Sequence, residues 1–231
     1  QRYKNFEIII VDNFSSDGTD KYVKSLKNKK IKFFKIKNHG VIGKSRNIGI
    51  KKSKGEWIAF LDADDQWLPN KLFDINKIIN LKNFHVICSS EMIIDKIKNK
   101  KKIWHYGPYK KNFYEFLLRY GNKLSTSSSI VKKKFLFSKK ILFSEKKKFS
   151  NVEDYDFFLN ISRQNGIFYF SKKIHGKHLF HSESSTLKRK KINEALFSVI
   201  KHHVNLQIFT KDKEKLLSEI NVYYKVKKFL E

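Results

Sequence analysis

The stretch FLDADD (60–65) places three carboxylates within four positions, directly after an apolar run. Carboxylates packed this closely raise one another's pKa and are unfavourable unless a cation compensates. Mg²⁺ and Mn²⁺ prefer such hard oxygen ligands and usually take only one or two from protein, while phosphate oxygens complete the shell. The cluster therefore indicates a metal–diphosphate site. The alternative is that Asp65 caps the following helix while Asp62 and Asp64 face water.

The segments around this cluster predict an α/β fold. The continuous apolar runs of 6–13 and 56–65 each end in polar residues, which is typical of strands buried on both faces of a parallel sheet. Residues 30–37 alternate Lys with apolar residues, as in a strand nearer an edge, and helical patterns at 20–30, 40–55 and 68–81 separate or follow these strands. Ligands of open α/β sheets bind beyond the carboxyl ends of the strands, where VDN and LDADD both fall.

From about residue 84 the alternation of elements changes, and we expect a more mixed arrangement. Strand patterns occupy 84–95, 102–107 and 127–136, and helical patterns occupy 114–121 and 152–166. A basic tail with two helical patterns follows residue 186. The second pattern carries one apolar face, made of Leu216, Leu217, Ile220, Tyr223 and Tyr224.

The composition restricts the class of protein. A hydrophobic content of 40% argues against disorder, and the lone Cys88 excludes a disulfide framework and favours a reducing compartment. No apolar run approaches the roughly 18 residues of a transmembrane helix. The net charge of +28 suits a polyanionic partner, although abundant Lys, Asn, Ile and Phe can also reflect an AT-rich genome. A cationic nucleic-acid-binding domain is an alternative, but the Lys runs are scattered along the chain, so no specific nucleic acid is expected.

Three motifs in order resemble the family 2 glycosyltransferases of the GT-A fold. They are EIIIVDNFSSDGT, then GKSRNIGIKKSKGEWIAFLDADDQWLPNKL, then VEDYDFFLNI. The resemblance is dense over 6–72, patchy to about 186 and absent beyond. It implies a GT-A domain at 1–187, with a mostly parallel mixed sheet flanked by helices. That domain divides into a nucleotide-binding half (1–105) and an acceptor half (106–187), and a basic helical appendage (188–231) follows it.

The resemblance also implies how a nucleotide-sugar donor would be held. Asp12 matches the acidic position that contacts the base, and Asn13 stands where members often have a second Asp. Arg46 matches a position that helps hold the nucleotide, and its guanidinium suits a diphosphate. Asp62 would face the ribose, and Asp64 would hold the Mn²⁺ or Mg²⁺ ion. Asp65 is expected as a supporting ligand or as the helix cap.

Further motif matches concern the transfer chemistry. An inverting transfer needs one general base, for which we predict Asp154, with Glu153 orienting it or the acceptor. The alternative is simple capping of a helix N-terminus by both carboxylates. His181, in the stretch HSESST (181–186), matches a position that can join the metal or the diphosphate. The hydroxyl-rich stretch 125–130 matches a region on the acceptor side, while Trp57 and Trp67 are expected to pack rather than bind sugar.

The chain also departs from the family pattern. Members normally begin one strand and one helix earlier, so we expect a fragment or a degenerate copy with weak donor binding and an unpaired sheet neighbour. A nucleotidyltransferase is less compatible, because no glycine-rich basic loop stands near the start. The expected acceptor is a glycan or lipid-linked glycan of bacterial surface polysaccharide or lipopolysaccharide, with a UDP-sugar as the expected donor. The expected location is cytoplasmic, and the basic tail offers peripheral contact with the inner face of the cytoplasmic membrane.

Overall fold

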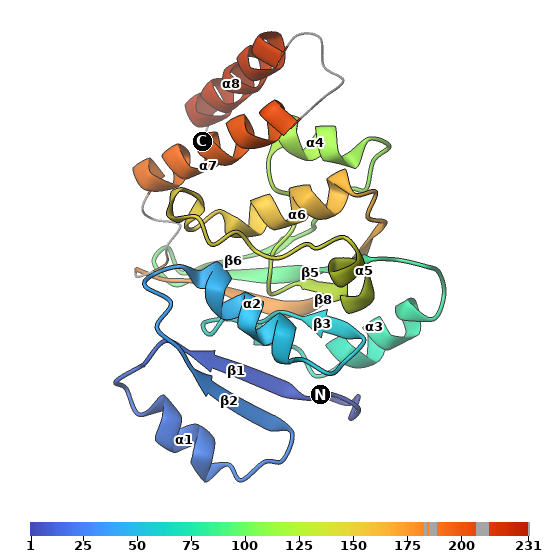
Figure 1. The fold of residues 1–231 in the computed structure, drawn as a ribbon, viewed down its shortest axis with the longest axis vertical. Coiled ribbons are helices and arrows are strands. Elements are labelled where there is room, and N and C mark those ends of the chain that lie inside the picture. The colour runs from blue at the N-terminus through green and yellow to red at the C-terminus, as the bar shows by residue number, and fades with distance from the viewer. Residues whose placement is uncertain (183, 185–188, 207–212, 231) are drawn as a thin grey trace.

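The computed structural model describes residues 1–182, 184, 189–206 and 213–230, which form a layered α/β structure (Figure 1). The first part of the chain alternates strands and helices, as the sequence predicts. Its elements are β1 (Ile8–Asp12), α1 (Thr19–Ser25), β2 (Ile31–Lys35), α2 (Ile42–Lys52), β3 (Trp57–Ala59), β4 (Gln66–Trp67) and α3 (Lys71–Ile79).

The second part is more mixed, again as expected. Its elements are β5 (Val86–Asp95), β6 (Lys100–Trp104), α4 (Phe113–Tyr120), β7 (Ser129–Lys132), α5 (Lys133–Ser138), the 3₁₀ turn η1 (Lys147–Phe149), α6 (Glu153–Arg163), β8 (Phe168–Phe180), α7 (Arg189–Leu206) and α8 (Lys213–Leu230).

The first strand lies in a small sheet of its own. β1 pairs in parallel with β2, from Ile8 opposite Ile31 to Asp12 opposite Lys35, and this sheet has two strands. The prediction that the first strand is buried on both faces is wrong, because Ile8 is 38% exposed and only Asp12 of this strand is buried. One face of β1 lies near α2, where the Cβ of an alanine at Gly49 would stand 4.0 Å from Val11 Cγ2. In the described residues, β1 does not pair with β3.

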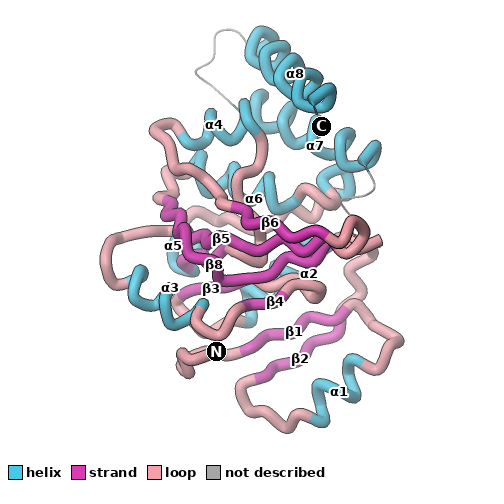
Figure 2. The backbone as a smooth tube through the Cα atoms, turned by 180° about the vertical axis from the view of Figure 1, so that it is seen from behind, coloured by secondary structure: helices cyan, strands magenta, loops and turns pink. Residues whose placement is uncertain are grey.

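The larger sheet has six strands in the order β3-β7-β5-β8-β4, with β6 paired to β5 (Figure 2). The α/β class and the mixed character of the sheet are confirmed. Only β5 and β8 pair in parallel here, whereas the other four pairs are antiparallel, so the sheet is less parallel than expected. The direct β5–β6 hairpin accounts for one antiparallel pair, because parallel neighbours need a long crossover connection.

The longest strand, β8, was not expected from the sequence. Its 13 residues mix Lys, His and Gly with aromatic residues, so neither alternation nor a continuous apolar run marks it. The pairing with β5 also slips: Ser89 faces Ser171, but Ser90 faces Ile174. This first shift inserts Lys172 and Lys173, and a second shift, from Ile174 opposite Ser90 to Gly176 opposite Glu91, inserts His175. The single residue of the second shift reverses the alternation of period two on which strand prediction depends.

Helices cover both faces of the six-stranded sheet. On one face, Ile75 of α3 packs with Ile87 and Ile130 of the sheet. The opposite face, which includes Val86 and Cys88, packs under α4 and α6, and α7 and α8 lie beyond them (Figures 1 and 2). The alternation of neighbouring β5 residues between two cores is the expected signature of a strand buried on both sides.

The C-terminal helices belong to the main hydrophobic core. Val199 and Val204 of α7 and Leu216 and Ile220 of α8 are buried in the same cluster as α4 and α6. The predicted apolar face of the last helix is thus packed against the protein. The expected boundary between residues 187 and 188 lies outside the described residues. No helix in the described ranges is long and apolar enough to cross a bilayer.

Candidate active site

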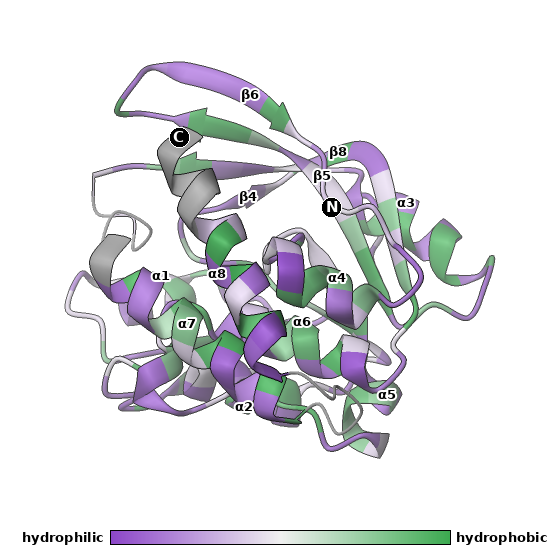
Figure 3. Cartoon of the chain, turned by 90° about the horizontal axis from the view of Figure 1, so that it is seen from above, coloured by the Kyte–Doolittle hydropathy of each residue, from purple (hydrophilic) through white to green (hydrophobic). Residues whose placement is uncertain are grey.

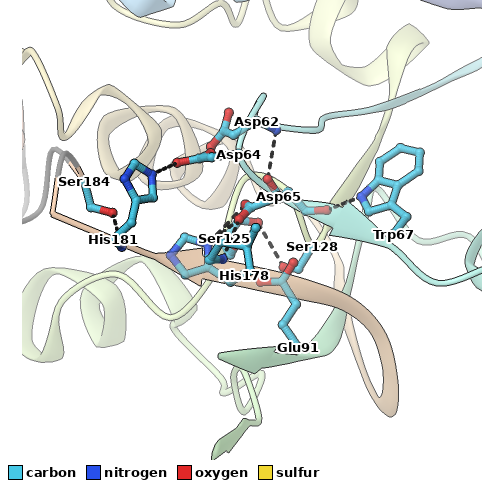
Figure 4. Close-up of polar contacts among 12 residues, drawn as sticks. Asp62, Asp64, Asp65, Trp67, Glu91, Ser125, Ser128, His178, His181 and Ser184 are labelled. Atoms are coloured by element: carbon cyan, nitrogen blue, oxygen red, sulfur yellow. Dashed lines mark hydrogen bonds and ion pairs between the residues drawn. The ribbon is translucent and has the colours of Figure 1, made fainter. Parts of the chain in front are cut away.

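The acidic loop between β3 and β4 carries the three predicted carboxylates. Phe60, at its start, is buried edge-on against Phe143 and Phe157, which fixes where the loop leaves the core. The backbone N–H of Asp62 donates to Ser127 Oγ at 3.0 Å, and the N–H of Asp65 donates back to the Asp62 carbonyl at 3.1 Å. This tight turn sends neighbouring carboxylates in different directions (Figure 4).

Asp65 points into the protein. Its carboxylate is buried and accepts hydrogen bonds from His178 Nδ1 at 3.1 Å and from the backbone N–H of Leu179 at 3.1 Å (Figure 4). Burial alone would raise the pKa of Asp65, but the bonds from His178 and Ser127 hold that pKa below its usual value. The same bond raises the pKa of His178. Asp65 therefore ties the acidic loop to β8, and both of its oxygens already have partners.

Asp64 points the other way, toward the end of β8. Its Oδ2 lies 3.3 Å from His181 Nε2, and the backbone N–H of His181 donates to Ser184 Oγ at 3.0 Å (Figure 4). The structure thus brings together two residues that the sequence predicts at the metal. Glu183, Ser185 and Thr186 of that motif lie outside the described residues.

The donor set at this point suits a divalent ion only in part. Within the described ranges, no group of three or more His, Cys, Asp or Glu side chains could hold a metal ion. An ion such as Mg²⁺ usually keeps one or two carboxylates and takes its other ligands from water and substrate phosphates. The exposed pair of Asp64 and His181 fits an ion that a diphosphate also binds.

Arg46 connects the acidic loop with α6. Its Nη2 lies 2.7 Å from Asp62 Oδ1, its Nη1 lies 2.7 Å from Glu153 Oε1, and its guanidinium stands 5.2 Å from the ring centre of Phe143. Burial would lower the pKa of Arg46, but the two carboxylates outweigh that effect and raise it. Three predicted residues from distant parts of the sequence therefore meet in one ion-pair network.

Asp154 follows Glu153 in the first turn of α6. Its Oδ2 accepts a hydrogen bond from Asn122 Nδ2 at 3.0 Å, and its Oδ1 accepts one from the Tyr155 N–H at 2.8 Å. Burial, and then the negative charge of Glu153, raise the pKa of Asp154 to about 7. A carboxylate with this pKa can both accept and hold a proton near neutral pH, which suits a general base.

The first motif is linked to this network through backbone and amide contacts. Both carboxylate oxygens of Asp12 accept the backbone N–H of Ser15, at 3.3 and 3.1 Å. Asn13 Oδ1 accepts the N–H of Asn38 at 2.9 Å, and Asn38 Nδ2 donates to Ser45 Oγ at 2.9 Å, one residue before Arg46. No hydrogen bond or ion pair among the described residues joins Asp12 directly to Asp62 or Asp154.

A buried support beneath the acidic loop escapes prediction from sequence. The carbonyl of Ser127 accepts hydrogen bonds from Trp67 Nε1 at 2.8 Å and from Lys71 Nζ at 2.7 Å. Lys71 is fully buried, and burial lowers its pKa to about 8. Ser127 belongs to the stretch 125–130 that was expected on the acceptor side. Through Ser127 this stretch holds the acidic loop, while Trp67 packs as expected.

Asn122, Asn38 and His178 also escape prediction. Asn122 bonds to Asp154 at 3.0 Å and His178 bonds to Asp65 at 3.1 Å, while Asn38 bonds both to Asn13 and to Ser45, the neighbour of Arg46, at 2.9 Å. A lone Asn or His in a loop or strand has no spacing pattern, so the sequence holds no signal for these roles.

Comparison with known protein families gives one clear match. The sequence model described as Glycosyl transferase family 2 matches residues 1–143, more than half of the chain. An uncharacterized glycosyltransferase of Rickettsia typhi is 30% identical over 241 residues, covering 97% of this chain and 72% of that protein. A glucosyltransferase of Escherichia coli, UDP-Glc:alpha-D-GlcNAc-diphosphoundecaprenol beta-1,3-glucosyltransferase WfaP, is 44% identical over 75 residues, covering 31% of this chain and 29% of that protein.

Solved structures show the same fold at low identity. Staphylococcus aureus TarS 1–349 in complex with UDP-GlcNAc aligns with a TM-score of 0.70 at 19% identity, covering 97% of this chain and 65% of that chain. GalNAc-T7 with UDP, GalNAc and Mn²⁺ aligns with a TM-score of 0.58 at 17% identity, covering 94% and 48%. These neighbours are GT-A transferases, so the predicted fold is confirmed.

The matched region spans only part of the length of several of these relatives. A Rickettsia bellii glycosyltransferase is 40% identical over 96 residues, which is 41% of this chain but 14% of that protein. The family model nevertheless covers more than half of this chain, and the Rickettsia typhi relative is matched over 97% of this chain and 72% of its own length. The chain belongs to glycosyl transferase family 2.

Proposed function

We propose that this chain transfers a sugar from a nucleotide-sugar donor to a hydroxyl group of a glycan or lipid-linked acceptor, with inversion at the anomeric carbon. The observation that carries the proposal is the position of Arg46 between Asp62 and Glu153. It joins the carboxylates assigned to the donor with the helix that presents Asp154. A group with a pKa of about 7 therefore lies next to a predicted diphosphate site.

The donor would lie along the network that begins at β1. We assign Asp12 and Asn13 to the base, Asp62 to the ribose and Arg46 to the diphosphate, which a guanidinium binds through paired hydrogen bonds. Asp64 and His181 would hold a Mn²⁺ or Mg²⁺ ion, which when bound neutralises charge on the leaving diphosphate. Asp65 is assigned to positioning this loop instead, because His178 and Leu179 occupy its oxygens.

Transfer would proceed in one displacement. The acceptor oxygen forms a bond to the anomeric carbon while its proton passes to the Asp154 carboxylate, and the bond from that carbon to the diphosphate oxygen breaks. Asn122 and the Tyr155 N–H hold the carboxylate in place for this role. Glu153 holds Arg46 through one oxygen, and its Oε2 is buried without a hydrogen-bond partner in the described part of the chain.

The names of relatives support a proposal for the chemical class of the substrates. The Escherichia coli relatives WfaP and WfgD are named as transferring glucose from UDP-Glc to a lipid-linked diphosphoundecaprenol sugar, and Staphylococcus aureus TarS was solved with UDP-GlcNAc. We propose a UDP-sugar donor and a lipid-linked acceptor in bacterial surface polysaccharide synthesis.

Titration of UDP into the protein by calorimetry, with Mn²⁺ and with EDTA, tests this assignment. We expect Asp64→Asn to weaken UDP binding about tenfold or more in Mn²⁺, because one charged metal ligand is worth at least about 1.4 kcal/mol. The control variant Glu194→Gln removes the same charge from the exposed face of α7 and should bind UDP like the wild type. A UDP affinity that is the same in Mn²⁺ and in EDTA, and the same in the wild type and Asp64→Asn, would contradict the proposal.

The turnover assay separates donor binding from chemistry. We expect Asp154→Asn to release UDP from a UDP-sugar at least about a hundredfold more slowly, since general bases contribute at least this factor, while UDP affinity stays within about twofold. An active Asp154→Asn variant would overturn the assignment of the base.

A further inference from the structure

The hairpin formed by β5 and β6 carries a basic surface that the proposed reaction does not use. Its exposed lysines are Lys96, Lys98, Lys100, Lys101 and Lys102. The one acid of this segment, Asp95, accepts the backbone N–H groups of Ile97 and Lys98 at 3.0 and 2.9 Å, so its carboxylate shapes the turn. The segment 95–104 therefore presents five positive charges against one negative charge.

These lysines have no charged partner among the residues that the structure describes. None of them forms an ion pair with a described residue. Lys102 Nζ lies 4.7 Å from the ring centre of Trp104, a contact that leaves the ammonium group exposed. The repulsion among five neighbouring ammonium groups is relieved when an anionic surface meets them.

The same hairpin exposes large apolar side chains. Ile97 in the turn is 53% exposed, and Ile103 and Trp104 in β6 are 51% and 47% exposed. A lysine-rich edge strand resists pairing with a further strand, so another β-strand is a poor partner. A surface that combines exposed Lys with Ile and Trp is typical of contact with lipid headgroups and the acyl boundary beneath them.

The hairpin lies beside the active site. The backbone N–H of Lys96 donates to the carbonyl of Phe180 at 2.9 Å, and Asp95 pairs with Phe180 in the sheet. His181 follows in the chain, next to Asp64. Figure 3 shows the hairpin projecting from the sheet, away from α1, α2 and α7. A flat surface that met its turn would therefore lie close to the end of β8 where the site opens.

We propose that the β5–β6 hairpin docks the protein on an anionic phospholipid surface, with its lysines on lipid phosphates and Ile97 at the acyl boundary. The C-terminal helices are less suited, because most of their described apolar residues pack in the core, and the exposed ones are scattered singly at Phe197, Leu206 and Val222. Nucleic acid would use the same lysines and could stack a base on Trp104, but the exposed aliphatic side chains of Ile97 and Ile103 suit an acyl boundary better than a base, so RNA binding is an outcome that the test must exclude. The purpose of docking, access to a lipid-linked acceptor, rests on the proposed function, whereas the docking itself does not.

Vesicle co-sedimentation without donor or acceptor tests this docking. We compare vesicles of phosphatidylcholine alone with vesicles that also contain phosphatidylglycerol. At about 1 kcal/mol per lysine near the surface, the triple variant Lys98→Gln, Lys100→Gln, Lys101→Gln should bind the mixed vesicles roughly a hundredfold more weakly. The matched control Lys24→Gln, Lys27→Gln, Lys29→Gln loses the same charge on the distant α1 side and should bind within about threefold of the wild type.

Tryptophan emission gives a second measurement of the same contact. The chain has three tryptophans, and the indole N–H of Trp67 already bonds to Ser127. Mixed vesicles should shift the emission to the blue, and Trp104→Phe should remove most of that shift. Ile97→Ser should weaken vesicle binding, while the thermal midpoint stays the same because the side chain is exposed.

Several outcomes would overturn the docking. They are equal losses in the two triple variants, no preference for phosphatidylglycerol in the wild type, or a hairpin variant that loses binding to RNA but keeps binding to vesicles. UDP titration of the hairpin variant should match the wild type in every case. A failure of docking therefore differs from a failure of the proposed transferase function, which would show in the UDP titration instead.

Discussion

At the scale of single residues, the carboxylate of Asp154 has the most unusual environment of the site. Burial and the neighbouring charge of Glu153 favour its protonated form, and Arg46 opposes them only in part. Ordinary aspartates hold no proton near neutral pH and are poor bases there. The free-energy cost of enclosing this charge is what we expect of the general base that we propose.

The free energy of unfolding should therefore depend on pH. The folded chain holds the Asp154 proton up to a pKa of about 7, whereas the ordinary pKa of an aspartate, which we take for the unfolded chain, is 3.8. Between these values the folded state binds more protons, so the free energy of unfolding falls as pH rises. The free energy of unfolding of the wild type should fall relative to that of Asp154→Asn, which has no carboxyl group to titrate at this position. The upper limit of this fall is about 1.4 kcal/mol per pH unit, and the actual fall should be smaller because Asp154 keeps some solvent contact.

Urea unfolding of both proteins at about pH 5 and about pH 7 measures this difference. Comparing the two chains removes the contributions of groups far from Asp154, so the change reports Asp154 together with the charges that interact with it. A difference in stability that stays constant between the two pH values would show that the carboxyl pKa is ordinary.

The hydrogen bond from Asn122 should also show in the pH profile. Its Nδ2 donates to Asp154 Oδ2 and favours the ionised form, so Asn122→Ala should raise the pKa of Asp154 by about one unit. The midpoint of the rate–pH curve should move to higher pH, and the rates should converge at alkaline pH, where both proteins are ionised. A rate that is lower at every pH would indicate a purely structural role for Asn122.

At the scale of elements, helix α2 carries Arg46 and is pinned by its neighbour Asn47. Asn47 Oδ1 accepts the Phe143 N–H, and its Nδ2 donates to the Phe143 carbonyl, both at 2.9 Å. Gly43, one turn earlier, lies so close to Ser144 that an added Cβ would stand 2.5 Å from its carbonyl oxygen. The helix is therefore locked against this segment by a double hydrogen bond and a close backbone approach.

Replacing Asn47 should uncouple the helix from the site. Asn47→Ala leaves the buried N–H and carbonyl of Phe143 unpaired, so the free energy of unfolding should fall by about 2–4 kcal/mol. UDP affinity should fall as well, because Arg46 loses its fixed position. Lys51→Ala on the exposed face of α2 should change stability by no more than about 0.5 kcal/mol. An equal effect of the two substitutions in urea unfolding would refute this account.

The sequence predicts some of these elements better than others. Helices such as α6 follow their apolar spacing, and the second motif places Arg46 on a helix and the three Asp residues on the loop after a strand, where the structure has them. The strand β8 carries no regular pattern, because two register shifts interrupt it and the one at His175 reverses its alternation, yet it supplies His178 to Asp65. Which carboxylate of the acidic loop turns inward depends on that distant strand, and spacing within the loop cannot reveal it.

At the scale of the whole molecule, the C-terminal helices complete the side of the core behind the active site. His203 Nε2 of α7 lies 2.9 Å from Asp156 Oδ1 of α6, and Tyr114 OH of α4 bonds to the His203 ring at 3.1 Å. These buried polar contacts join three helices around the one that presents Asp154. A tail that served only as a basic membrane anchor would need none of them.

Two substitutions in α8 distinguish an integral helix from an appended one. Leu216 is 4% exposed and belongs to the main core, whereas Val222 on the same helix is 57% exposed. Leu216→Ala should lower the free energy of unfolding by about 2–4 kcal/mol through lost burial and a residual cavity, and Val222→Ala by no more than about 0.5 kcal/mol. Both should appear in one cooperative urea transition, because α8 unfolds with the core that it covers. If Leu216→Ala left that transition unchanged, α8 would be an appendage and the support of α6 would have to come from α4 and α7 alone.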